Sequence, residues 1–193
     1  MEQDPKLEKP TEDDKKRYLE EDFFYEVKMF MYSFEQLTKP SNIGEEHKAS
    51  VTYINIPSIQ RALESGFGDA FFLNMALETF LLHARNLREF FYGDRKKFPD
   101  DVRSSDLLDQ WETLRPKESM EIERIRDQAG EELAHLTYKR MHGTPPGKEW
   151  SYRKIFSEFL EVIRIFLKNL PEKYFNKNLI ILMAEVKRFP GHA

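Results

Sequence analysis

The sequence predicts an all-α fold, specifically an up-and-down bundle of four to five main helices with one long internal loop. Long proline-free stretches repeat apolar residues at three- and four-residue steps, the spacing of amphipathic helices. Hydrophobic residues make up 40% of the 193-residue chain and include 16 phenylalanines, enough to fill one core. The single β-branched run, residues 51–56 (VTYINI), has no evident partner strand.

We predict a mobile tail over residues 1–10 and a single helical domain over residues 11–193. Thr11 supplies an N-cap oxygen, and no proline follows until Pro40, so a long aromatic-rich helix is expected between them. Residues 39–50 are expected to form a loop. Residues 51–56 are read as an extended or helical lead-in to a short helix that begins at Pro57 and ends at Gly66.

The stretch 71–92 is expected to be the central helix, with Asp69 as its N-cap and Gly93 at its end. One face is apolar and should pack in the core. Arg85 and Glu89 lie on the opposite side at a four-residue spacing that suits an exposed ion pair. A third line of residues is polar beside the core and needs partners; it comprises Thr79, His83 and Asn86.

Residues 94–117 are predicted to be irregular apart from a helical piece, DLLDQWETL, whose Leu107, Leu108 and Trp111 attach this connection to the bundle. A helix should follow from Glu118 to about residue 140. Another should begin after Ser151, which is expected to be its N-cap, and end before Pro171. A last amphipathic helix is expected over about residues 178–187.

Composition excludes several classes of function. The chain has no cysteine, which removes disulfides, thiolate catalysis and cysteine-ligated zinc. Its N-terminus is charged and no apolar run is long enough to span a bilayer, so we expect a cytoplasmic protein without a membrane partner. We also expect no cofactor. The net charge of -4 does not favour RNA as a partner.

Arg126, Thr137 and Arg140 lie on or near the face of the 118–140 helix that should point to the core. A buried arginine needs an anionic partner. One interpretation is an internal salt bridge, to Glu78 or Glu132. The other is a pocket between this helix and the line of Thr79, His83 and Asn86, which would bind an anion such as phosphate.

Glu132 and His135 form a Glu-x-x-His step, the spacing that di-iron bundles use, and are weak candidates for metal ligands. A second Glu-x-x-His is absent from the sequence. Glycine-rich phosphate loops, Ser-His-Asp order and HExxH are absent as well. The candidates for catalysis are therefore Arg126, His135 and Arg140, and the overall reading leans away from an enzyme.

The segments HARNLREFF, DDV, a following Trp and EELAHLTYKR resemble a group of uncharacterised bacterial all-helical proteins over about residues 70–150, and more distantly the HEPN superfamily. The HEPN resemblance implies a helical bundle, often dimeric, that is associated with RNA cleavage or nucleotidyltransferase partners. Arg126-Asp127 begins like the HEPN ribonuclease motif, but His135 lies farther along than that motif places its histidine, and His142 lies too close to Arg140.

We therefore expect a HEPN-like interaction module that binds a second copy of itself or a protein partner. Two alternatives remain open: an RNA-cleaving or phosphate-handling enzyme that uses Arg126, His135 and Arg140, and a carboxylate-histidine metal bundle.

Overall fold

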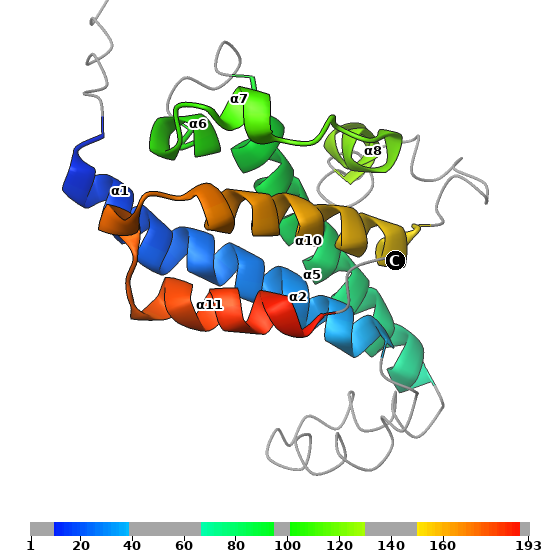
Figure 1. Cartoon of the computed structure of the whole chain (residues 1–193). Helices are drawn as coiled ribbons and strands as arrows, with labels where there is room; N and C mark the ends of the chain where they lie inside the picture. The colour runs from blue at the N-terminus through cyan, green and yellow to red at the C-terminus, as the bar shows by residue number, and fades with distance from the viewer. Residues whose placement is uncertain (1–9, 39–66, 95–100, 130–149, 190–193) are drawn as a thin grey trace, which may run out of the picture.

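The computed structural model describes residues 10–38, 67–94, 101–129 and 150–189 (Figure 1). Within these ranges all regular secondary structure is helical, which confirms the predicted all-α class. The predictions for residues 51–56 and for the short helix after Pro57 lie outside the described residues, as does nearly all of the predicted N-terminal tail.

The first three elements follow one another without a break: α1 (Glu12–Tyr18), a π-helical turn η1 (Leu19–Phe23) and α2 (Phe24–Thr38) (Figure 1). Thr11 is the N-cap, as predicted. Its Oγ1 accepts from Asp14 N at 3.1 Å, and Asp14 Oδ2 accepts from Thr11 N at 3.0 Å, a reciprocal pair that satisfies helix-end donors. The π turn brings both Leu19 and Phe23 into the core.

Two helices flank the continuous segment formed by α1, η1 and α2. They are α10 (Tyr152–Asn169) and α11 (Lys177–Arg188), joined through a 3-10 turn η3 (Glu172–Tyr174) (Figure 1). The helix α10 has the broadest buried face of the molecule's described part, with eight apolar side chains. Ser151 occupies its N-cap position, but the side chain makes no cap hydrogen bond, contrary to our expectation. Asn176 does cap α11, since its Oδ1 accepts from Leu179 N at 2.9 Å.

The central helix α5 (Phe67–Tyr92) packs mainly against α2. It begins four residues before the predicted start, so Asp69 lies inside its first turn and is not the N-cap. The predicted apolar face is confirmed in its C-terminal half, where Phe80, Ala84, Leu87 and Phe91 are buried. The helix ends before Gly93, as predicted. A Cβ atom on Gly93 would lie 2.3 Å from the carbonyl oxygen of Glu89, so the chain turns there without room for a side chain.

Two single-turn helices, α6 (Ser104–Leu107) and α7 (Trp111–Leu114), close the C-terminal end of α5 (Figure 1). Leu107 and Trp111 are buried, which confirms that they attach this connection to the bundle. Three side chains donate to the last carbonyls of α5: Ser104 to Phe90 at 3.0 Å, and Trp111 and Arg115 to Phe91 at 2.9 and 3.0 Å. Arg103 donates to the carbonyl of Gly93, directly after the helix, at 2.8 Å. These donors satisfy the unpaired carbonyls of the helix end, and the two guanidinium groups also complement its negative dipole.

The helix α8 (Met120–Ala129) begins two residues later than predicted, after Ser119, whose Oγ accepts from Ile122 N at 3.2 Å. Ile122 and Ile125 pack into the core. Arg88 of α5 fixes the approach to this helix, because its Nε donates to Glu118 Oε1 at 2.7 Å and its Nη2 donates to Glu118 Oε2 at 3.2 Å. The carboxylate of Glu118 raises the pKa of Arg88 despite the opposing effect of burial.

Candidate functional site

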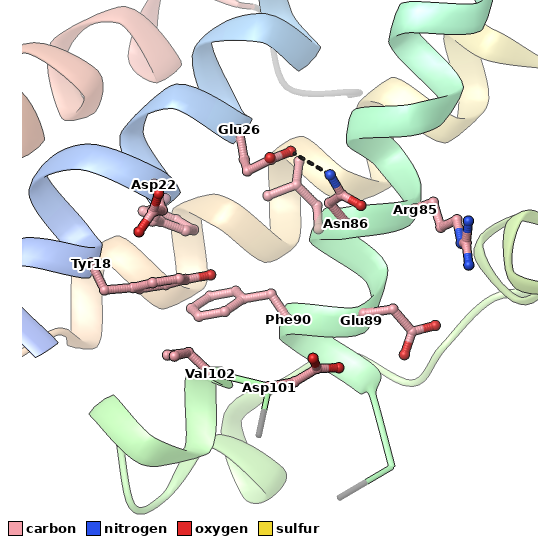
Figure 2. Close-up of a pocket in the computed structure, with 11 residues that line it drawn as sticks. Tyr18, Asp22, Glu26, Arg85, Asn86, Glu89, Phe90, Asp101 and Val102 are labelled. Carbon is pink, nitrogen blue, oxygen red and sulfur yellow. Dashed lines mark hydrogen bonds between the residues drawn. The ribbon is translucent and has the colours of Figure 1, made fainter. Parts of the chain in front are cut away.

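The polar line of α5 contacts α2. His83 is 5% exposed, and its Nδ1 lies 2.7 Å from Oε2 of Glu26. Asn86 donates to the same oxygen from its Nδ2 at 3.1 Å (Figure 2). One carboxylate from α2 therefore serves both polar groups. The facing groups were predicted on the 118–140 helix, of which residues 130–140 lie outside the described residues. Within the described part of the chain, the carboxylate that meets His83 and Asn86 comes from α2.

Other residues singled out from the sequence do not join this cluster. Thr79 is half-buried one turn before His83. Arg126 is exposed on α8 and lies 3.7 Å from Glu123 of the same helix, so in the described part of the chain it is a surface residue. The predicted ion pair between Arg85 and Glu89 does not form, since Glu89 accepts instead from Arg88 at 3.0 Å.

The remaining candidates lie outside the described residues; they are Glu132, His135, Thr137 and Arg140. The RNA-cleaving and metal alternatives both depend on them. Among the residues that the structure does describe, no group of three or more histidine, aspartate or glutamate side chains is placed to hold a metal ion.

We call Glu26, His83 and Asn86 the Glu26 cluster. A cleft of about 540 Å³ opens beside it, between the continuous segment of α1, η1 and α2, the C-terminal half of α5 and residues 101–102 (Figure 2). Its floor is aromatic, because the rings of Tyr18 and Phe90 stack with centroids 5.8 Å apart. Four carboxylates and one guanidinium line it; they belong to Asp22, Glu26, Glu89, Asp101 and Arg85.

The cleft is electrostatically negative. Burial, and then the charges of Asp22, Glu26 and Asp101, raise the pKa of the Tyr18 phenol. The only cation of the lining among the described residues, Arg85, projects from α5 away from Glu26 (Figure 2). Such a cleft disfavours phosphate and RNA, whose charge it would repel. The anion pocket predicted beside the 118–140 helix involves Thr137 and Arg140, which lie outside the described residues.

A different surface lies on the outer side of α2 and α5, where four positions on each helix, spaced three or four residues apart, hold no charge. This α2/α5 face consists of Tyr25, Met29, Tyr32 and Gln36 on α2 and Met75, Thr79, Leu82 and Asn86 on α5. Four of its large apolar side chains are exposed to solvent by about half: Tyr25 55%, Tyr32 58%, Met75 47% and Leu82 49%. In a chain that is 33% charged, these eight positions form an exposed surface without a charged side chain.

Charged residues border the α2/α5 face on both sides. Lys28 and Glu35 lie along the outer edge of α2, and Glu78 and Arg85 lie along the outer edge of α5. Lys28 is paired with Glu185 of α11 at 2.6 Å. An apolar centre with a charged border is the usual composition of a protein-protein interface.

Two side chains that make contacts between helices were not singled out from the sequence. Glu26 reads as one more charge on a long helix, and nothing local indicates that it meets a residue 57 positions away. Arg88 could have been found, because it lies four residues after Ala84 and seven after Leu81, both of which are buried. That spacing places Arg88 on an inward-facing side of α5, where a buried guanidinium needs a carboxylate partner.

Comparison of the chain with protein-family models, with curated proteins and with solved structures finds no match. Across the described ranges, no helix combines the length and the apolar character needed to cross a membrane.

Proposed function

We propose that this protein is a HEPN-like interaction module of the bacterial cytoplasm that acts as a homodimer, without chemistry of its own. The single observation behind this proposal is the α2/α5 face, an uncharged surface with half-exposed Tyr25, Tyr32, Met75 and Leu82. Exposed tyrosine and methionine are enriched where protein surfaces meet, and removing them from water upon association is favourable.

The polar groups of α5 support the same reading. A general base or an anion ligand must be reachable by its substrate. His83 is only 5% exposed, and the cleft that adjoins Asn86 and Glu26 is negative. The catalytic alternative, which needs phosphate-binding groups beside His83, therefore receives no support from the described residues.

The oligomeric state of the purified chain tests this proposal. Sedimentation velocity at roughly 50 µM should give twice the mass of one chain, as a dissociation constant in the low micromolar range requires. Tyr32→Asp and Leu82→Glu should each shift the protein toward monomer at that concentration, because each buries a charge in the centre of the interface.

Ile180→Glu is the matched control. Ile180 is 59% exposed on α11, so the same change in chemistry is made away from the α2/α5 face. It should leave the dimer intact. A wild-type chain that stays monomeric, or an Ile180→Glu variant that dissociates as fully as Leu82→Glu, refutes the proposal.

A further inference from the structure

The register between α2 and α5 is fixed by their contacts. Phe30 stacks on Phe80 with ring centroids 4.7 Å apart, and Glu26 bonds to both His83 and Asn86. Residues earlier in α2 therefore meet residues later in α5, so the two helices are antiparallel. One to two residues before Phe30 in α2 are Lys28 and Met29, and one to two residues after Phe80 in α5 are Leu81 and Leu82. These two pairs therefore lie side by side, at the same height along the two helices.

Three features of the α2/α5 face are centred on this one level. Tyr25 and Tyr32, the two exposed tyrosines of α2, lie on either side of it. Glu78 and Arg85, which have opposite charges, lie on either side of it along α5. Leu82 is at the level itself and is 49% exposed. A shared midpoint is what a surface needs in order to match a rotated copy of itself.

Glu78 and Arg85 are both available for a partner. Neither makes an ion pair with any residue of the described part of the chain. They are two helical turns apart, too far to pair with each other along one helix, where ion pairs form at three- and four-residue spacings.

We infer that the occupant of the α2/α5 face is a second copy whose two-fold axis crosses the helices at the level of Leu82. This inference rests on the proposed homodimer and adds its geometry. Each α5 then lies antiparallel to the partner's α5, with Leu82 against the partner's Leu82. Glu78 faces the partner's Arg85 twice, and Tyr25 faces the partner's Tyr32 twice.

A two-fold axis parallel to the helices is the competing arrangement. It would set α5 over the partner's α2, and each residue would stay at the same height along the helix axes in both copies. Glu78 is level with Tyr32, so it would then lie about one turn from both the partner's Glu35 and the partner's Lys28, whose opposite charges largely offset each other. Reversing the charge at position 78 should therefore weaken the dimer clearly only in the first arrangement.

Charge reversal tests the axis. Glu78→Arg and Arg85→Glu should each weaken the dimer by about tenfold to thirtyfold, because each variant converts two exposed attractive pairs into two repulsive ones. The double variant Glu78→Arg with Arg85→Glu should return to within about threefold of wild type, because it restores both pairs with the charges exchanged. A Glu78→Arg variant that does not weaken the dimer, or a double variant no better than the singles, overturns the inference.

Disulfide trapping gives an independent readout, because the native chain contains no cysteine. Leu82→Cys should form an intermolecular disulfide under mild oxidation, since the two copies of residue 82 meet at the axis. Ile180→Cys, at a more exposed position on α11, should not. If wild type is a dimer but Leu82→Cys does not cross-link, the axis is wrong and the homodimer stands. If wild type is a monomer, the homodimer itself fails.

Discussion

Replacing Glu26 tests whether the polar line of α5 is architecture or a free site. Glu26→Ala removes the acceptor for His83, whose ring is 5% exposed, and for the more exposed Asn86. A hydrogen bond to a charged group contributes about 1.5–3 kcal/mol when one partner is buried, and the exposed bond adds little. We expect a loss of about 2–3 kcal/mol in the free energy of unfolding, seen in a chain of this length as a fall of about 5–10 °C in Tm.

Urea denaturation followed by circular dichroism, at one fixed protein concentration, measures this loss. Glu26→Gln keeps the side-chain length and one acceptor oxygen, so it should lose only about 1 kcal/mol. Glu35→Ala is the matched control, an exposed glutamate of the same helix whose removal should change stability by less than about 0.5 kcal/mol. If Glu26→Ala is as stable as Glu35→Ala, then His83 does not depend on Glu26 and the architectural reading is refuted.

Three further predictions follow from the structure. Trp111→Phe should lose about 1–2 kcal/mol, measured by the same denaturation, because the buried indole donates to the carbonyl of Phe91 at 2.9 Å and phenylalanine cannot. The hydrogen bond from Lys173 is the main reason that the pKa of Glu12 is lowered to about 2 from 4.5. Its contribution to stability is therefore present above about pH 4.5 and disappears as the pH falls through 2, so Glu12→Gln should differ from wild type near neutral pH and converge with it in acid. A single-stranded RNA oligonucleotide at about 0.1 M salt should show no saturable binding in a fluorescence anisotropy titration, because the cleft is negative; saturable binding would contradict that charge argument.

The helices could be predicted because their causes are local. The capping oxygen of Thr11, the break at Gly93, the aromatic periodicity of α2 and the amphipathic face of α10 are all visible within one or two turns of sequence. The misplaced cap at Asp69 shows the limit of this reasoning. An aspartate before an apolar run suits an N-cap, but it is equally tolerated inside a first turn, where the helix dipole favours its charge.

The site could not be predicted in the same way, because its contacts join distant parts of the chain. The sequence identifies His83 and Asn86 as polar groups that need partners, which the structure confirms. It does not identify the partner, since any of several glutamates on any neighbouring helix would satisfy the same groups. The arginines of the 118–140 helix favoured that helix as the partner of His83 and Asn86, although Arg126 is a surface residue in the described part of the chain.

The Glu26 cluster also has a consequence for the proposed dimer. It lies at the junction of α2 and α5, and with the Phe30–Phe80 stack it fixes the level of Tyr25 and Tyr32 relative to Leu82. A slip of one turn would displace the tyrosines by about 5.4 Å along α2, and their midpoint would no longer coincide with that of Glu78 and Arg85. We therefore expect Glu26→Ala to weaken the dimer in sedimentation velocity and Glu26→Gln to weaken it less. Equal dimer affinity in all three proteins would mean that the aromatic stack alone sets the register.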